Sequence, residues 1–468
     1  MSVTRSAVRH ASHKLMLQTG LGIASLALSI SAAYGAPVFD QPDPDFNGQL
    51  SSFGAPALPA GKAVISGRSF KPGQEVTLSS NGTILNPNGP LVADEKGVFK
   101  GEISIPADAV PGIHPVVVQV AKPSAASIFN FKISPVIALS GQEKFTATAK
   151  KMVPGVYQSA YSEKTDRLFV TAAVGRPPVK ESQLLKVNPT TLDIEAKVTP
   201  AVDKDNDKGQ LMAVYGVATD DAHDNVWVTN TRAGTVAVYK QSDLKLVKQF
   251  SPKAAPHARD VVIDAKRSKA YVSTPGNDHI VIFDTSKLTE AGKIELPSES
   301  KEEFSPMSVA LDSKAGKLYT VSLSTNEAAI IDLDTEKVEK MIALPRAKAS
   351  SGVAVDSSGK RLFVAAQGTD NVLIVDLASG KVLHDVAVGA GPLNITYDPV
   401  SKYAYVAIRG AGTVAVLNED GKIIANLEAG TYPNHITVDG KGHAFVLNKS
   451  RGKDDETADR LTRLNVKM

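Results

Sequence analysis

The chain has 468 residues, 43% hydrophobic and 22% charged, which is typical of a folded chain with room for two or three domains. It contains no cysteine, which excludes a disulfide scaffold, a thiolate metal site, a cysteine nucleophile and an iron–sulfur cluster. The formal net charge is +3, and the first 35 residues account for it with three basic and no acidic residues. A net charge of zero for the rest argues against nucleic acid as a partner, because phosphate binding needs an excess of Lys and Arg.

The N-terminal segment has the features of a secretory signal peptide. The basic residues Arg5, Arg9 and Lys14 precede an apolar stretch over residues 15–33, and small residues then allow cleavage near Gly35. An uncleaved membrane anchor is the alternative, although Gln, Thr and Gly residues dilute the stretch. We therefore expect a signal peptide over 1–35, a periplasmic or secreted mature protein, and no membrane span after the signal is removed.

Residues 36–60 are rich in Pro, Gly, Ser and Asp and show no hydrophobic period, which predicts an extended linker. From residue 61 to residue 136, short stretches alternate between apolar and polar residues and are separated by turn sequences. This pattern predicts about seventy residues of antiparallel strands in a small β-sandwich.

The predicted sandwich resembles the immunoglobulin-like (Ig-like) modules of bacterial exported proteins. The residues that carry the resemblance are Gly67-x-x-Phe70-x-Pro72-Gly73-x-x-Val76, Asp94-x-x-Gly97-x-Phe99 and Pro111-Gly112-x-His114. Such modules space or present other domains, so the resemblance implies a scaffold without a fixed active site.

The remainder, residues 137–468, contains seven internal repeats. In each repeat a short strand ends at a turn-forming residue, and an aromatic residue follows six or seven positions later. The turn-forming residues are Ser162, Asp220, Asp264, Asp312, Asp356, Asp398 and Asp439, and the aromatic residues are Phe169, Trp227, Tyr271, Tyr319, Phe363, Tyr405 and Phe445. Successive aspartates are 41 to 48 residues apart, which is the length of one four-stranded propeller blade. Turn formation explains the aspartates without a catalytic role.

The closure of the ring can also be predicted. The seventh repeat stops at Met468 without a fourth strand, whereas residues 145–153, just before the first blade starts near residue 156, have no sheet of their own. As the outer strand of the last blade, they would cover an open edge. The predicted fold is therefore all-β: a seven-bladed β-propeller of four-stranded blades, the last closed by an N-terminal strand, preceded by a small Ig-like β-sandwich.

The second strands of the repeats resemble those of YVTN-type seven-bladed propellers, the YncE-like exported proteins of bacteria. The nearest copies are Phe169-Val170-Thr171, Trp227-Val228-Thr229-Asn230 and Tyr271-Val272-Ser273. The resemblance covers roughly two-thirds of the chain. It implies the propeller fold and no fixed catalytic set, and the simplest members lack the N-terminal sandwich.

A ligand site is expected at the channel mouth, where the loops before the first strand and after the second strand of every blade meet. Positions four and five residues before each turn-forming residue place varied side chains there, and basic residues follow some second strands. The candidate ligand-binding residues are Tyr157, Gln158, Tyr215, Arg232, Arg259, Asp260, Met307, Asn394, Arg409, Asn434 and His435.

Basic residues concentrate at the same mouth. Arg176, Arg232, Arg409, Lys449 and Arg451 would give a neutral protein a locally positive surface there. This charge predicts a small anionic ligand, a polymer or an envelope protein as the partner of a monomeric chain. An ordinary solvated rim of charges is the alternative interpretation.

One insertion is a weak calcium candidate, and no other cofactor is expected. Asp203, Asp205 and Asp207 are spaced as in a calcium loop, but the following Gly209 is one place late for an EF-hand and Val214 replaces the expected Glu. A flexible acidic loop is the preferred interpretation.

No catalytic residue is assigned, because the sequence has no GxSxG elbow, HExxH pair or P-loop. A single Trp also argues against the Trp-rich quinoprotein propellers. We therefore expect a non-catalytic binding or scaffold protein of the envelope. A metal-dependent hydrolase of lactonase type is the alternative, and the convergent ligands that the mouth offers it are Asp260, Asn394, Asn434 and His435. His257 and His435 are otherwise interpreted as hydrogen-bonding surface residues.

Overall fold

The computed structural model describes residues 39–206, 208–452 and 454–467. The predicted signal peptide lies outside these ranges. Within them the chain folds almost entirely into strands, with one short 3-10 helix, η1 (Gln142–Lys144). No helix in the described ranges is both long and apolar enough to cross a membrane.

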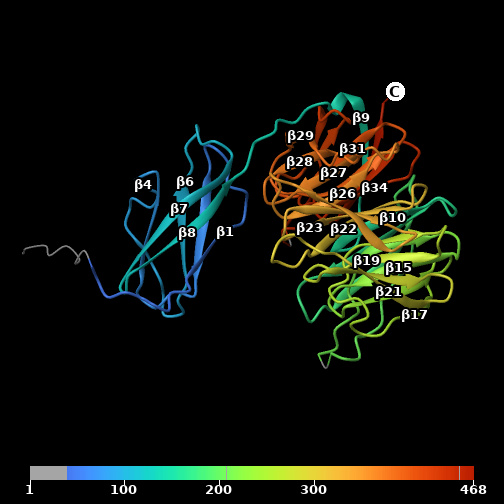
Figure 1. Ribbon diagram of the computed structural model, residues 1–468, viewed down its shortest axis with the longest axis horizontal. Helices are drawn as coiled ribbons and strands as arrows, with labels where there is room; N and C mark the ends of the chain where they lie inside the picture. The colour runs from blue at the N-terminus through green and yellow to red at the C-terminus, as the bar shows by residue number, and fades with distance from the viewer. Residues whose placement is uncertain (1–38, 207, 453, 468) are drawn as a thin grey trace, which may run out of the picture.

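The first eight strands form two sheets, shown on the left of Figure 1, with strand orders β1-β2-β6 and β4-β3-β7-β8, and β5 pairs with β3. Alternate side chains of both sheets meet in one core that includes the fully buried Ile65, Val76, Leu78 and Val118. The strands are β1 (Gln49–Phe53), β2 (Lys62–Arg68), β3 (Glu75–Ser80), β4 (Thr83–Ile84), β5 (Leu91–Val92), β6 (Phe99–Ser104), β7 (Gly112–Ala121) and β8 (Ala125–Ile133).

Strand β1 corrects the prediction of a linker over residues 36–60. It pairs antiparallel with β2, from Gln49 opposite Arg68 onward, and Leu50 packs against the core. The exposed Ser51 and Ser52 interrupt the apolar alternation that identifies a strand, so the Pro, Gly and Ser content dominates the sequence pattern.

The chain from residue 145 onward forms seven four-stranded antiparallel sheets in the described ranges. The first three contain β10 (Val156–Ser162), β11 (Arg167–Val174), β12 (Glu181–Val187) and β13 (Ile194–Val198); β14 (Val214–Asp220), β15 (Asn225–Asn230), β16 (Thr235–Lys240) and β17 (Leu246–Gln249); and β18 (Val261–Asp264), β19 (Lys269–Ser273), β20 (His279–Asp284) and β21 (Thr289–Glu295). The next two contain β22 (Pro306–Asp312), β23 (Lys317–Ser322), β24 (Glu327–Asp332) and β25 (Lys337–Ala343); and β26 (Ser350–Val355), β27 (Arg361–Ala366), β28 (Asn371–Asp376) and β29 (Val382–Ala387). The last two contain β30 (Pro392–Asp398), β31 (Tyr403–Ile408), β32 (Thr413–Leu417) and β33 (Ile423–Glu428); and β34 (Pro433–Val438), β35 (His443–Asn448), β36 (Arg460–Val466) and β9 (Phe145–Lys151).

These sheets form a closed ring around a central channel. The first strand of each sheet contacts the first strand of the next, and β34 of the last sheet contacts β10 of the first. The last sheet takes its outer strand from the other end of the ring, since β9 pairs with β36 from Phe145 opposite Val466 to Lys151 opposite Arg460. This pairing covers the edge of β36 and joins the two ends of the ring.

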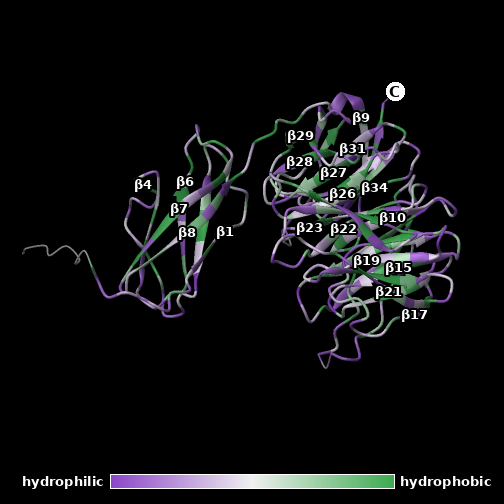
Figure 2. Cartoon of the chain, viewed as in Figure 1, coloured by the Kyte–Doolittle hydropathy of each residue, from purple (hydrophilic) through white to green (hydrophobic). Residues whose placement is uncertain are grey.

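The repeated aromatic residues hold neighbouring sheets together. All seven are buried; Trp227 lies 5.7 Å from Phe250 and 6.0 Å from Phe283 between ring centroids. Burying a large apolar side chain contributes about 1.5–3 kcal/mol to stability. Figure 2 shows hydrophobic stretches within many of the strands and hydrophilic stretches on many of the connecting loops.

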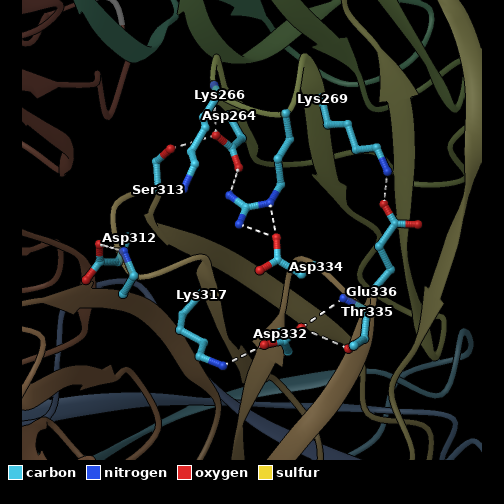
Figure 3. A network of polar contacts seen from close by, with 12 residues as sticks. Asp264, Lys266, Lys269, Asp312, Ser313, Lys317, Asp332, Asp334, Thr335 and Glu336 are labelled. Atoms are coloured by element: carbon cyan, nitrogen blue, oxygen red, sulfur yellow. Dashed lines mark hydrogen bonds and ion pairs between the residues drawn. The ribbon is translucent and has the colours of Figure 1, made fainter.

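The repeated aspartates cap the turns that follow the first strands, which confirms the turn prediction. Asp356 Oδ1 accepts hydrogen bonds from the backbone N–H groups of Lys360 and Arg361 at 2.8 and 2.9 Å. Asp264 also belongs to a polar network between the third and fourth sheets (Figure 3). Its carboxylate accepts a hydrogen bond from Ser313 Oγ at 2.6 Å and pairs with Arg267.

Candidate functional site

The innermost strands of all seven sheets line a channel of about 570 Å³. Most of the lining side chains are small or apolar. Polar side chains four residues before the turn include Asp260, Ser308, Asn394 and His435, and Thr219, Thr396 and Thr437 add others nearer the turn. The first set lies at the end of the channel where the candidate ligand-binding residues gather.

Three of those predicted residues connect neighbouring sheets. Asp260 Oδ2 accepts a hydrogen bond from Val309 N at 3.2 Å, and Asn394 Oδ1 accepts one from Ile436 N at 2.8 Å. The same kind of bond joins the seventh sheet to the first, where Ser159 N donates to Nδ1 of His435 at 3.3 Å. Each bond satisfies a backbone donor of the next innermost strand, so these side chains stabilise the ring.

Burial shifts the pKa of two of these side chains. It raises the pKa of Asp260, which opposes ionisation of that carboxyl group. It lowers the pKa of His435 to about 3, and the charge of Arg259 acts in the same direction. His435 is therefore a neutral imidazole that lines the channel, and its neutral Nδ1 accepts the Ser159 bond.

Hydroxyl groups on the second strands fix the backbone of the mouth. Thr171 donates to the carbonyl oxygen of Tyr215 in the next sheet. Thr229 Oγ1 donates to Arg259 O at 3.0 Å, and Ser273 Oγ donates to Met307 O at 3.1 Å. Sequence reasoning did not assign these residues to the site, although each follows the repeated aromatic residue by two positions and so carries a periodic signal.

Tyr157 is the centre of the mouth. Arg259 Nη1 donates to its hydroxyl group at 2.7 Å, and Lys449 Nζ lies 4.6 Å from its ring centroid. Its ring meets that of Tyr215 edge to face at 4.8 Å, and Asn434 Nδ2 donates to its carbonyl oxygen at 2.8 Å. These contacts bring side chains from the first, second, third and seventh sheets to one point.

A second tyrosine, Tyr432, extends the cluster. The guanidinium groups of Arg409 and Arg451 each lie 4.7 Å from its ring centroid. Arg409 Nη1 also donates to Asn434 Oδ1 at 2.7 Å, which connects this group to Tyr157. We name these residues, Tyr157, Arg259, Arg409, Tyr432, Lys449 and Arg451, the cationic mouth.

The cations of this mouth lack carboxylate partners. In the described part of the chain, their side chains contact tyrosines and an amide and form no ion pair. The Nε of Arg259 is buried without a hydrogen-bond partner. Arg259, Arg409 and Lys449 are half-buried, and Asp260 and Asp459 lie near enough to act on Arg259 and Lys449 without forming an ion pair with them. Half-buried cations that are not ion-paired favour the binding of an anion.

The pKa values in the mouth reflect this excess of positive charge. Burial lowers the pKa of Arg409 and that of Lys449, and the nearby Arg259 contributes to both shifts. Burial raises the pKa of Tyr157, but the charges of Arg259, Lys449 and Arg409 outweigh it and lower that pKa below its ordinary value. A bound anion would relieve the repulsion among the cations.

Other predicted residues lie outside the cluster. Arg232 and Arg176 are exposed and make no described contact with it, whereas Gln158 is buried and Met307 is half-buried. Of the arginines that the sequence places at the mouth, Arg259 is the one that hydrogen-bonds Tyr157, and it directly precedes Asp260 in the chain.

The acidic insertion is organised by its own hydrogen bonds. Asp203 Oδ1 accepts from Asp205 N at 3.1 Å, and Oδ2 accepts from Gln210 Nε2 at 3.4 Å. Asp207 lies outside the described residues. Elsewhere in the described chain, Asp278, His279 and Glu295 come close enough to share a metal ion, but Glu295 already pairs with Lys293 at 2.6 Å.

The sequence has distant curated relatives. "Uncharacterized protein YncE" of Salmonella typhi is 26% identical over 324 residues, which cover 66% of this chain and 87% of the relative. The protein of the same name from Salmonella typhimurium (strain LT2) has the same identity and coverage. No protein-family model matches the chain.

Solved structures resemble the fold. Kuenenia stuttgartiensis hydrazine synthase has a TM-score of 0.54 at 17% identity, covering 64% of this chain and 94% of that one. A streptogramin B lyase structure has a TM-score of 0.54 at 14% identity, covering 70% of this chain and 100% of that one. At such identities the likeness concerns the fold alone. The chain is therefore a distant homologue of YncE with a β-propeller fold.

Proposed function

We propose that this chain is an exported, non-catalytic binding protein of the bacterial envelope that holds an anionic ligand in its cationic mouth. In this proposal, residues 137–468 are a seven-bladed propeller, residues 61–136 are an Ig-like module, and a signal peptide over 1–35 directs export. The seven four-stranded sheets, the two N-terminal sheets and the basic N-terminus support these assignments.

One observation carries the binding role. Arg259, Arg409 and Lys449 converge on the channel mouth without an ion pair among the described residues, and tyrosine rings and an amide hold them in place. Guanidinium groups match the planar geometry of carboxylates and phosphates, and desolvation strengthens such charge-assisted hydrogen bonds. This arrangement is suited to recognition rather than to chemistry on the ligand.

The four side chains that a metal-dependent hydrolase would use as ligands also favour a binding role over a catalytic one. Asp260, Asn394 and His435 hydrogen-bond backbone N–H groups of the next sheet, and the amide of Asn434 is shared between Arg409 and Tyr157. These four side chains therefore have structural partners within the ring.

Citrate and inorganic phosphate are suitable probes of the site. We expect isothermal titration calorimetry on the mature chain to detect binding of at least one of them, with affinity falling as salt rises. The double variant Arg259→Gln/Lys449→Gln should lose at least about tenfold in affinity, because two charge-assisted contacts are removed. Arg232→Gln, which changes an exposed arginine, is the matched control. Equal binding by the double variant and the control, or no binding of either anion, would contradict the proposal.

A further inference from the structure

The N-terminal unit contacts the propeller next to the cationic mouth. Lys132 Nζ at the end of β8 pairs with Asp370 Oδ1 at 2.7 Å and donates to Gln367 O at 3.0 Å. The connecting segment is held as well, since Asn426 Nδ2 donates to Ile137 O at 3.0 Å. These contacts fix β8 against a loop of the fifth sheet and the connecting segment against β33 of the sixth sheet.

Beside these contacts the seam between the two units is open. One groove of about 400 Å³ and another of about 500 Å³ lie along it, and they share Pro56, Ala390 and Gly410 in their walls. Since they share three lining residues, we treat them as one continuous cleft and name it the seam groove.

The seam groove begins at the cationic mouth. Arg409 and Tyr432 line its first part, and Arg451 lines its second. Glu428 is the only acidic residue among the described residues that line either part. The rest of the propeller wall is mostly Gly, Ala and Thr, so the positive charge that a ligand meets there comes from Arg409 and Arg451.

The opposite wall includes two edge strands. β1 and β8 each end their sheets, and Ser52 of β1 and Lys132 of β8 both line the groove. Phe129, Asn130 and Lys132 of β8 line the groove, and the neighbouring Ile128 is 59% exposed. The central part of β8 pairs only with β7, so its outer edge offers unpaired backbone N–H and C=O groups.

We propose that the seam groove binds a short, extended acidic peptide segment of another protein, which adds as a strand to the free edge of β8. The added strand would run within the groove, where Arg409 and Arg451 are available to bind its carboxylates. The proposal rests on the anion-binding function of the mouth and names a class of partner for it. It also gives the N-terminal unit a direct part in recognition.

A fluorescein-labelled peptide of alternating Glu and Val tests the proposal by fluorescence polarisation on the mature full-length chain. We expect saturable binding that Arg451→Gln weakens at least about fivefold and that Arg232→Gln leaves unchanged. A peptide of the same sequence with alternate backbone amides N-methylated should not bind, because it cannot pair with β8.

Three other outcomes would overturn the strand-addition proposal or the anion-binding function. Equal binding of the N-methylated peptide, or equal binding of a sulfated oligosaccharide, would overturn strand addition and leave a general polyanion surface. If citrate binds and the peptide does not, the seam proposal is wrong while the anion-binding function stands. If neither binds, both proposals are wrong.

Discussion

Arg409 donates a hydrogen bond from Nη1 to Oδ1 of Asn434 over 2.7 Å. The guanidinium group is therefore oriented by a neutral amide, whereas a carboxylate in the same position would neutralise its charge. The same amide donates from Nδ2 to the carbonyl oxygen of Tyr157 at 2.8 Å, which fixes its orientation. Because Asn434 has no charge, the positive charge of Arg409 remains available to a ligand.

Asn434→Asp should therefore reduce anion binding although the side chain keeps its shape. The new carboxylate would pair with Arg409 and repel an incoming anion, so we expect citrate affinity to fall at least about tenfold by calorimetry. Asn434→Ala removes the orienting amide without adding charge and should cost less affinity than Asn434→Asp. An Asp variant that binds citrate as the parent does, with an unchanged circular dichroism spectrum, would show that the ligand does not use Arg409.

Tyr157 should ionise at a lower pH than the buried core tyrosines Tyr239 and Tyr405. Its pKa lies below the ordinary value because Arg259, Lys449 and Arg409 outweigh the effect of burial. In contrast, burial raises the pKa of Tyr239 and of Tyr405 to about 12. The ultraviolet absorption of tyrosinate measures this difference, and Tyr157→Phe identifies the contribution of Tyr157.

Changing the charges around Tyr157 provides the control for that titration, because each change should shift the pKa of Tyr157. Arg259→Gln should raise the pKa of Tyr157, because it removes the largest of the favourable charges. Saturating citrate should raise it too, since a bound anion opposes a second negative charge. A titration that Tyr157→Phe leaves unchanged would exclude the depressed pKa.

Local sequence patterns predicted much of this architecture. The aspartate in each turn and the aromatic residue that follows it have purely local causes, namely turn capping and burial on a period-2 strand, and Asp356 and Trp227 illustrate both. Strand β1 was missed because Ser51 and Ser52 break the alternation on which strand prediction depends.

The positions of the candidate site residues could be predicted from the sequence, but the contacts between them could not. Counting back from the turn placed Tyr157, Arg259 and Asn434 at the mouth, because equivalent positions of repeated blades face the same end. Their mutual contacts depend on the rotation of one sheet against the next, which no local pattern encodes. For the same reason, the sequence grouped the exposed Arg232 with the cluster and did not include Tyr432.

Lys132→Met should loosen the N-terminal unit from the propeller. Lys132 pairs with Asp370, whose side chain is only 2% exposed and also accepts a hydrogen bond from Gly391 N at 2.8 Å. The variant leaves a buried carboxylate with fewer partners, so we expect a loss of about 1–3 kcal/mol in the free energy of unfolding. Small-angle X-ray scattering should show a larger radius of gyration.

A surface ion pair provides the comparison for this variant. Lys62 pairs with Glu102, and both side chains are more than half exposed. Lys62→Met should therefore change stability by less than about 1 kcal/mol and leave the scattering curve unchanged. Equal effects of the two variants would mean that Lys132 does not hold the units together.

His435 should make the protein less stable as pH falls through the mildly acidic range. Burial lowers its pKa from 6.5 to about 3 in the folded chain. Below pH 6.5 the unfolded chain therefore binds a proton that the folded chain does not bind, so stability falls with pH until both states are protonated near pH 3. The slope from this one group is at most about 1.4 kcal/mol per pH unit.

His435→Asn isolates that contribution. At the equivalent position of the sixth sheet, the amide of Asn394 accepts the hydrogen bond from the backbone N–H of the next sheet. The variant therefore keeps an acceptor for that bond but has no titrating group. Urea unfolding between about pH 4 and pH 7 should give a smaller acid loss for His435→Asn than for the parent chain. If His435→Asn keeps the acid slope of the parent chain, the imidazole takes up a proton in the folded ring, and the Ser159 N–H then needs another acceptor.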